Sequence, residues 1–597
     1  MDCPQALNHR IRNTAWEATL LLLLPLAFYR GFAEPFSTPK SFLAKFAVIS
    51  GLALLGLEEI WRILPRRHRS SFAIPLCTLS VALLGSCLAS PVPRFSLMEV
   101  VYGLCGPGWL LLLVCWENGE RAIHRISALV GLAGGLVAGV ALLQRIGFDP
   151  VLLGGYRVDW GTMVPRMHMY STFGNPNFVG GYLIGAIFAV VVLVATAKTW
   201  HARAVWTCVA LMVLAAIILT GSHGAWLGLA VGSIAALITA ATHYGWAFEP
   251  IQEKWGVTNA RPVAAPLLWF PPAVITSSLA KRIAVQLHGR LYLCRFSWPA
   301  FWQHPIAGSG WGTYQLHYLN LQGQFLGAHP EFIGFWTNNR YLHNDALQVI
   351  LETGLLGFGA FIWILWRYGQ EAVRARQKST NAFACYAVAA SLGGVAAILT
   401  DSLFNYQFAV PPTYLLLFTL LAIPSLLVGE GLENGAGGIP NASHPHSHRL
   451  EVVGRIVGSI AVAAIASALL LQQARFLASE RDYQSALDME NRLALPGAES
   501  AFRRSLELNA LNGRARFGLS RVLLSRGRPF EALAQVIQSE QTFADSHQEV
   551  LRGQILERMG SNREAIQAYR RAISLDPTLT EIEKVASDLQ RALGPTD

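Results

Sequence analysis

Long apolar runs separated by short polar segments occupy most of the first 472 residues of the chain. A helix needs about 20 apolar residues to cross a bilayer, and thirteen runs approach that length. They centre on residues 15–34, 42–60, 72–90, 97–115, 126–144, 177–197, 204–221, 223–241, 263–280, 346–366, 380–400, 412–428 and 454–472. The run 263–280 contains three prolines, which membrane helices tolerate when neighbouring groups satisfy the freed backbone. The pattern predicts an all-α, polytopic membrane protein with about 12–13 transmembrane helices.

Beyond residue 472 the pattern becomes amphipathic and repeats itself. Three small-large-small triplets follow one another at offsets of 34 and 33 residues: Ala498/Phe502/Ser505, Ala532/Val536/Ser539 and Ala565/Tyr569/Ala572. This spacing is similar to that of tetratricopeptide repeats, which stack helix pairs into an α-solenoid. We therefore expect a membrane domain over 1–428, a flexible linker over 429–451, a last transmembrane helix over 452–472 and a repeat domain over 473–597. The repeats could bind a protein partner or serve only as a stabilising cap.

Composition agrees with a membrane protein, since 53% of the residues are hydrophobic and only 14% are charged. The net charge is +10, but residues 473–597 are balanced, so the excess lies in the apolar part. It gathers on alternate loops, for example at Arg121 and Arg125 and again at Arg367 and Arg374. Under the positive-inside rule these loops are cytoplasmic. The loop 281–345 and the repeats are then expected on the other, outer side of the membrane. No nucleic-acid partner is expected, and the 8 cysteines form no CxxC pair, so neither a zinc site nor a disulfide framework is indicated.

The outer loop 281–345 is unusually rich in aromatic and basic residues, among them Arg290, Arg295, Trp298 and Trp336. Aromatic faces stack on sugar rings, and arginine forks grip phosphates. The loop composition therefore suits a glycan on a phosphorylated carrier. An aromatic belt at the membrane interface, together with a folded loop core, would have the same composition.

A spaced motif follows at the end of this loop. His343 and Asn344 are followed by nine residues and then by Gly354 and Gly357. At 3.6 residues per turn, His343 and Gly354 would lie on one helix face, and the glycines would allow close helix contact. His343 would then be half wet at the outer mouth of a span, titrate near neutral pH and accept a proton from a sugar hydroxyl. A purely structural or interfacial histidine is the alternative.

The pattern His-Asn-x9-Gly-x-x-Gly resembles the signature of bacterial O-antigen ligases and O-linked protein oligosaccharyltransferases, which form one superfamily with O-antigen polymerases. Two further segments are similar to blocks of that superfamily. One combines Gly289-Arg290-Leu291 with 304–310 (HPIAGSG), and the other is 171–178 (STFGNPNF). The resemblance covers roughly residues 15–430.

The resemblance implies a glycosyltransferase of the kind that acts in lipopolysaccharide biosynthesis. Such an enzyme moves a glycan from undecaprenyl diphosphate to an acceptor hydroxyl on lipid A-core, another glycan or a protein. The reaction takes place on the periplasmic side, without a cofactor. Arg290 then matches the residue thought to hold the diphosphate, and His343 matches the general base. Attack opposite the diphosphate would invert the anomeric carbon.

One position departs from the family pattern. The superfamily usually carries an arginine in a turn between two central spans, where this chain has His223 within Thr220–Trp226. Because imidazole offers no permanent fork, another arginine would have to help hold the diphosphate, and Arg157, Arg166 and Arg295 are candidates. An inactive relative is also compatible with this substitution. Asp401, at the outer end of a span, could orient His343 or an arginine, or cap its helix.

Four functions remain open at this stage. We favour ligase-type transfer. An O-antigen polymerase would use a second lipid-linked glycan as acceptor, and a protein O-oligosaccharyltransferase would use a Ser or Thr hydroxyl. A non-catalytic scaffold would use the repeats to assemble envelope machinery. A transporter fits less well, because the spans show no path of buried charges and no inverted repeat.

Overall fold

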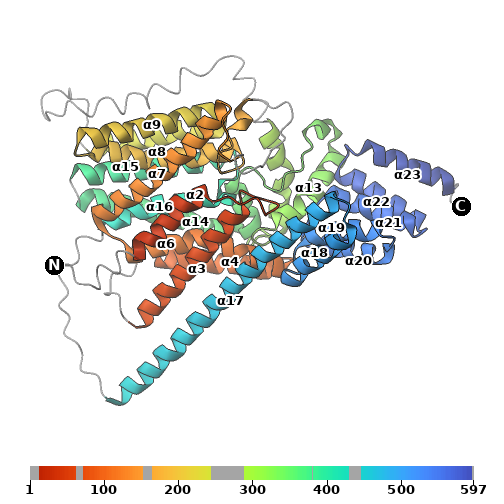
Figure 1. Ribbon diagram of the computed structural model, residues 1–597. Helices are drawn as coiled ribbons and strands as arrows, with labels where there is room; N and C mark the ends of the chain where they lie inside the picture. Colours follow the sequence, from red (N-terminus) through yellow and green to blue (C-terminus); the bar gives the residue numbers. More distant parts are fainter. Residues whose placement is uncertain are drawn as a thin grey trace.

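The computed structural model describes residues 12–61, 71–151, 165–243, 288–378, 381–428 and 445–593. Every regular element within these ranges is helical, as the sequence predicts. A bundle of long apolar helices makes up one part of the molecule, and a stack of shorter helix pairs makes up the other (Figure 1).

Ten helices of the described part are long and apolar enough to cross a membrane, and they coincide with ten of the predicted runs. They are α3 (Thr38–Ile60), α5 and α6 together (Pro93–Trp116), α7 (Gly119–Arg145), α8 (Pro176–Thr196), α9 (Trp200–Leu219), α10 (His223–His243), α14 (Asp345–Lys378), α15 (Ala382–Asp401), α16 (Pro411–Val428) and α17 (Pro445–Asn491). Run 72–90 forms the shorter α4 (Ala73–Ala89), and run 15–34 contains η1 (Ala18–Leu23) and α2 (Leu24–Leu26). The proline-rich run 263–280 lies outside the described residues.

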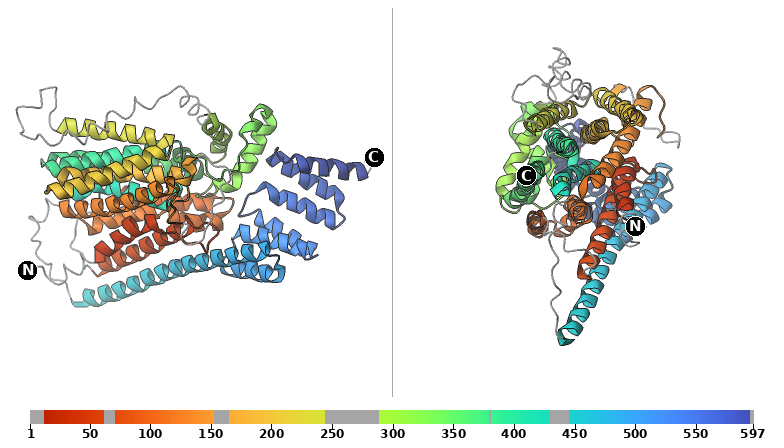
Figure 2. Two further views of the ribbon diagram at one scale, coloured as in Figure 1. Left: turned by 45° about the horizontal axis from the view of Figure 1, so that its top comes forward. Right: turned by 90° about the vertical axis from the view of Figure 1, so that its left-hand side faces the viewer.

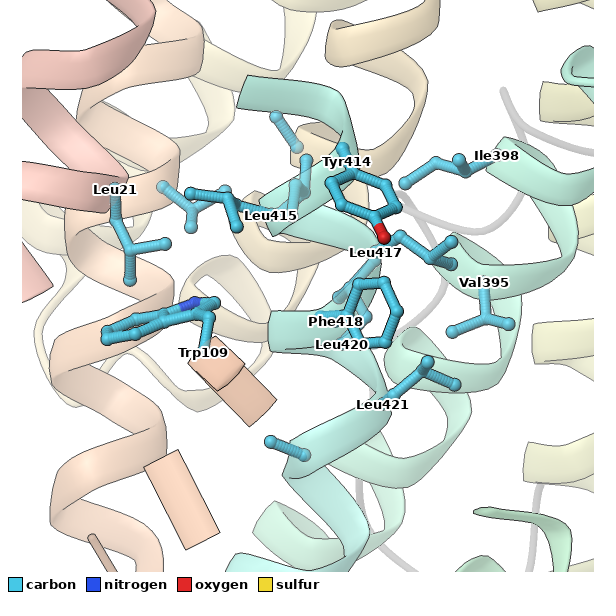
Figure 3. Close-up of a cluster of buried hydrophobic side chains, with 14 of the residues drawn as sticks. Leu21, Trp109, Val395, Ile398, Tyr414, Leu415, Leu417, Phe418, Leu420 and Leu421 are labelled. Carbon is cyan, nitrogen blue, oxygen red and sulfur yellow. The ribbon is translucent and has the colours of Figure 1, made fainter. Parts of the chain in front are cut away.

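Helix α16 runs through the middle of the bundle and is almost completely buried. Figure 3 shows Tyr414 and Phe418 of α16 between Trp109 of α6 on one side and Ile398 of α15 on the other. The Trp109 indole N–H donates to Thr419 Oγ1 at 2.9 Å. This bond satisfies two polar groups that would otherwise be costly to bury.

The last membrane helix and the start of the repeats form one element. Helix α17 begins at Pro445, inside the predicted linker, and continues without a break to Asn491. The helix thus includes the last residues of the predicted linker and crosses the predicted boundary at 472, and the rest of the linker, 429–444, lies outside the described residues. Helix α17 packs along α3, where the Trp61 indole N–H donates to Ser459 Oγ at 2.9 Å. It then joins the bundle to the repeat domain as a continuous rod (Figure 1).

The repeat domain stacks α18 (Leu495–Leu508), α19 (Gly513–Ser525), α20 (Pro529–Ser539), α21 (Ser546–Arg558), α22 (Asn562–Leu575) and α23 (Thr580–Leu593). All nine triplet positions identified in the sequence are buried. A Cβ built on Gly518 would come within 2.4 Å of the Phe502 ring, and one on Gly553 within 2.4 Å of the Tyr569 ring. The large residue of each of these two triplets thus fills the space that a glycine leaves on the next or preceding helix.

The outer loop lies between the bundle and the repeats. It contains a helical segment over 288–297, η4 (Trp298–Gln303), α13 (Tyr314–Ala328) and η5 (Pro330–Phe335). Helix α13 packs against α22 of the repeat domain (Figure 2). The motif residues of the outer loop therefore lie close to the junction of the two parts.

Candidate active site

His343 immediately precedes the first turn of α14. The side-chain oxygen of Asn344 accepts from the backbone N–H of Leu347 at 2.9 Å, so Asn344 caps the helix. His343 itself has a left-handed backbone with φ +57°. This conformation is uncommon for a histidine and costs on the order of 1 kcal/mol or more. Such strain persists only where the surrounding structure imposes it, which marks His343 as a functional candidate.

The prediction that His343 and Gly354 share one helix face is wrong. His343 lies before the helix, and Gly354 interrupts α14 with φ 62° and ψ −166°. A Cβ on Gly354 would lie 2.2 Å from the carbonyl oxygen of Ile306. The glycine therefore serves a backbone break and a close loop contact. Gly357 does remain helical, and its Cβ position meets only the Thr353 side chain of its own helix.

The break in α14 is bound to the segment 304–310. The N–H of Leu355 donates to the carbonyl of Pro305 at 2.9 Å. In return, the N–H groups of Ser309 and Gly310 donate to the carbonyls of Leu351 and Glu352 at 3.0 and 2.9 Å. Two motifs that are about fifty residues apart thus complete each other's backbone hydrogen bonds. Their role is to fix the outer end of α14, just below His343.

His343 contacts one ring of an aromatic cluster centred on Tyr406. Its imidazole meets the ring of Tyr406 edge-on at 4.6 Å between centroids, and Tyr341 stacks on the same tyrosine at 4.5 Å. Phe178, from the segment 171–178, contacts Tyr406 at 5.0 Å. Burial raises the pKa of Tyr406 to about 12, so its phenol stays protonated at neutral pH and can donate a hydrogen bond. The sequence reasoning missed Tyr406, because a single aromatic residue after a span carries no distinctive pattern.

Segment 171–178 is held in place by hydrogen bonds to α2 and α3. The Lys40 ammonium donates to the carbonyl of Thr172 at 2.6 Å, and the Thr172 hydroxyl donates to the carbonyl of Pro25 at 2.7 Å. The side chain of Asn175 caps α8 by accepting from the N–H of Asn177 at 2.8 Å. This segment therefore has a structural role in positioning Phe178 against Tyr406.

Arg290 brings a positive charge to the same place. It is half-buried in the helical segment 288–297, and within the described residues it makes neither a hydrogen bond nor an ion pair. Its charge acts on His343, on Tyr406 and on Asp401. A cation without a partner beside buried carboxyl and phenol groups is suited to bind an anion.

His343 is a neutral base in this environment. Burial, and after it the nearby charge of Arg290, lowers the pKa of His343 to about 3. The expectation that it titrates near neutral pH is therefore wrong, because the side chain is less wet than its place at a helix mouth suggested. Its Nδ1 is buried and has no hydrogen-bond partner among the described residues. A neutral imidazole with an unused nitrogen can accept a proton.

Asp401 does not orient His343 through a hydrogen bond in the described part of the chain. Its carboxylate accepts from the side-chain amides of Asn405 at 2.7 Å and Gln407 at 2.6 Å. A Cβ on Gly224 would lie 2.3 Å from Asp401 Oδ1. Asp401 thus lies between the Arg290 side of the site and the first turn of α10.

His223 is the first residue of α10, directly after the turn 220–222, and its ring contacts Trp226 edge-on at 5.3 Å. Arg166, in η3 (Pro165–His168), donates to the carbonyl of Gly221 in this turn at 3.0 Å. Of the substitute arginines, Arg166 is therefore the one found beside His223. Arg295 instead lies over the rings of Phe325 and Phe332, at 5.7 and 5.3 Å. Arg157 lies outside the described residues.

The two tryptophans singled out from the loop have packing roles. The Trp336 indole N–H donates to the carbonyl of Leu575, at the end of α22, at 3.0 Å. Trp298 stacks on Phe301 at 5.3 Å and leaves 44% of its surface exposed. No contact found in the structure joins either tryptophan to His343. Both belong to the folded loop that carries Arg290.

Comparison with known proteins identifies one part of the chain. No curated protein matches the chain. A family model described as a tetratricopeptide repeat-like domain matches residues 459–586. The match begins within α17 and ends within α23, and so confirms that the C-terminal part of the chain is a tetratricopeptide repeat-like domain.

Proposed function

We propose that this protein is a membrane glycosyltransferase of the O-antigen ligase type. It would move a glycan from undecaprenyl diphosphate to an acceptor hydroxyl. The observation that carries the proposal is the pairing of His343, strained and neutral, with Arg290, a cation that has no partner among the described residues. A base and an anion-binding group side by side are what such a transfer needs.

The proposed reaction is a single displacement. The acceptor oxygen forms a bond to the anomeric carbon while its proton passes to an imidazole nitrogen of His343. The bond from the anomeric carbon to the diphosphate oxygen breaks, and the electron pair leaves with the diphosphate. Arg290 stabilises the negative charge that develops on that oxygen. Attack from the side opposite the leaving group inverts the anomeric carbon.

Donor binding would also strengthen the base. The charge of Arg290 is one of the two causes that hold the pKa of His343 low. A bound diphosphate would neutralise that charge, so the imidazole would become more basic only when the donor is in place. Arg166, bound to the turn directly before His223, would supply the second positive charge that the family normally places there.

The proposed location is the bacterial inner membrane, with the site and the repeats on the periplasmic side. The basic residues of alternate loops support this orientation. Labelling an introduced cysteine at position 343 from the periplasmic face would test it. Labelling from the cytoplasmic face only would overturn the assignment.

The repeat domain supports a second candidate, a scaffold that assembles envelope polysaccharide machinery, since repeat solenoids commonly bind other proteins. The enzyme and the scaffold can be distinguished with two variants, His343→Asn and a deletion of the repeats. A scaffold would tolerate His343→Asn and lose function when the repeats are deleted, whereas an enzyme would lose activity in His343→Asn.

The acceptor class can be tested in cells that lack this protein. The lipid carrier is extracted, and the size of the glycan attached to it is measured by mass spectrometry. Accumulated long polymer supports a ligase or a protein O-oligosaccharyltransferase. Accumulated single repeat units point instead to a polymerase. An unchanged carrier pool would contradict all three enzymes and favour the scaffold.

A further inference from the structure

A cavity of about 310 Å³ lies where the bundle, the outer loop and the repeat domain meet. Its walls come from α3 and α5 of the bundle, from the start of α14 and from the first repeats. Figure 2 shows these repeats seated against the end of the bundle. The volume is within the usual range of small-ligand sites, which starts at about 300 Å³.

The bundle contributes two charges to this cavity that are not paired. Lys45 of α3 and Glu99 of α5 make no hydrogen bond and no ion pair with any described residue, although the charge of Lys45 acts on the Glu99 carboxyl. The only ring that Lys45 meets in the described part is that of Phe476, at 5.3 Å. Ionisable side chains on membrane helices are costly and typically mark a ligand site or an ion path.

The repeats form a wall that is fixed in place. Arg514 of α19 pairs with Glu34 at 2.7 Å and with Glu480 at 3.0 Å. Arg340 of the outer loop lies over the ring of Phe543 at 5.1 Å. These contacts join the repeat domain to both the bundle and the loop, so the repeats form one wall of the cavity.

The lining suits a sugar better than an anion or a lipid chain. It holds five carboxyl side chains against three cationic ones, an excess that disfavours a phosphate. Amides such as Gln315 and Asn512 and aromatic rings such as Trp311 lie beside them. Carboxylates and amides hydrogen-bond hydroxyl groups, and aromatic faces cover sugar rings. An acyl chain would leave Glu99 and Lys45 desolvated without a hydrogen-bond partner, whereas Glu34 and Glu480 already pair with Arg514.

The cavity adjoins the candidate active site without containing it. Tyr341 and Asp345 line it, whereas His343 and Arg290 do not. Tyr341 stacks on Tyr406, and Tyr406 contacts the ring of His343. A ligand in the cavity is therefore separated from the base by a layer of aromatic side chains.

We propose that this cavity binds sugars of a glycan acceptor that lie remote from the reacting one, beyond Tyr341 and Tyr406, and that these sugars are neutral or carry an amino group. The inference depends on the proposed function in one respect only: that the bound sugars belong to the acceptor of the transfer. It gives the repeat domain an intramolecular role, because the repeats complete a carbohydrate site.

The test uses the full chain in lipid nanodiscs and a printed array of neutral, amino-sugar and anionic oligosaccharides without lipid. The wild type should retain neutral or amino-sugar oligosaccharides. Glu99→Gln and Lys45→Met should each weaken retention by about tenfold, as expected for one lost hydrogen bond to a charged group. Glu507→Gln makes the same change as Glu99→Gln on an exposed residue of α18 outside the cavity, and should bind like the wild type.

Thermal unfolding of each variant shows whether it is folded. Absence of retention by the folded wild type, a preference for anionic glycans, or full binding by both folded cavity variants would overturn the proposal. His343→Asn separates it from the proposed function. If His343→Asn transfers glycan normally and Glu99→Gln binds oligosaccharide weakly, the proposed enzymatic function is rejected and the carbohydrate site is supported. If His343→Asn loses transfer and Glu99→Gln binds oligosaccharide fully, the enzymatic function is supported and the carbohydrate site is rejected.

Discussion

At the scale of single residues, the central feature is the environment of His343. The left-handed backbone is imposed on the histidine between two well-anchored neighbours. Its preceding residue, Leu342, is completely buried, and Asp345 accepts from the N–H of Phe408 at 3.0 Å through its carboxylate. The strain and the unused Nδ1 together fit a residue kept for chemistry, since a purely structural side chain would satisfy its polar atoms.

The lowered pKa of His343 predicts the pH dependence of transfer. The base acts in its neutral form, and its pKa is lowered to about 3, so the donor kcat/KM should show no acid limb from His343 between about pH 5 and 8. In the donor-bound enzyme the diphosphate neutralises Arg290, so the acid limb of the kcat profile should lie at higher pH than that of kcat/KM. Arg290→Gln should move the kcat/KM limb upward as well, because one cause of the lowering is gone. An acid limb near pH 6.5 in the wild-type kcat/KM would contradict this account.

Arg166 offers a second test at the residue scale. If it supplies the charge that His223 lacks, Arg166→Gln should raise the donor KM by about tenfold or more while kcat changes less, since the diphosphate is bound in the ground state too. The measurement is transfer from purified lipid-linked donor in proteoliposomes. His201→Ala, an exposed histidine at the start of α9, is a suitable unaffected control. An unchanged KM in Arg166→Gln would remove this arginine from the site.

At the scale of elements, the break in α14 carries a prediction about stability. Gly354→Ala places a Cβ 2.2 Å from a backbone oxygen and in a left-handed conformation, so it should destabilise the protein by about 2 kcal/mol or more. Gly359→Ala on the same helix meets nothing within 4 Å and should be neutral or slightly stabilising. Thermal unfolding in detergent compares the two. Equal transition temperatures would show that the break is not required.

Elements were predictable where one physical rule dominates. Apolar runs of bilayer length located ten helices that are long and apolar enough to span a membrane, because a membrane core leaves the backbone few alternatives to a helix. The repeat triplets located the helix pairs, since their positions are all buried. The break at Gly354 was not predictable, because it depends on hydrogen bonds to 304–310, a segment about fifty residues away. The start of α17 at Pro445, before the predicted end of the linker, was equally hidden, since the residues there resemble those of a loop.

At the scale of the whole molecule, the repeat domain is part of the site region. Its contact with the outer loop places Gly323 of α13 against the backbone of Ser574, where a Cβ would lie 2.5 Å from the carbonyl oxygen. Gly323→Val should therefore push α22 away from α13 and raise hydrogen exchange in α22. Gly327→Val, one turn later with nothing within 4 Å, is the matched control. Unchanged exchange in Gly323→Val would show that the repeats are not held by this contact.

In the candidate site too, some residues could be predicted from the sequence and others could not. His343 and Arg290 were found from motif and resemblance, and the structure brings them close enough for one charge to act on the other. Tyr406, Arg166 beside His223 and the cavity under the repeats arise from contacts between distant segments. Sequence spacing carries no information on such contacts. Trp336 is the clearest case, because its indole serves the repeat contact through Leu575.

The most direct test of the central claim replaces the base and keeps its backbone. Asparagine adopts the left-handed conformation more readily than most residues, so His343→Asn should fold and insert normally. Purified donor and acceptor in proteoliposomes then report transfer. The account predicts a loss of about 10²- to 10⁴-fold in kcat, the usual contribution of a general base, with donor binding retained. Transfer at the wild-type rate by the folded His343→Asn protein would contradict the account.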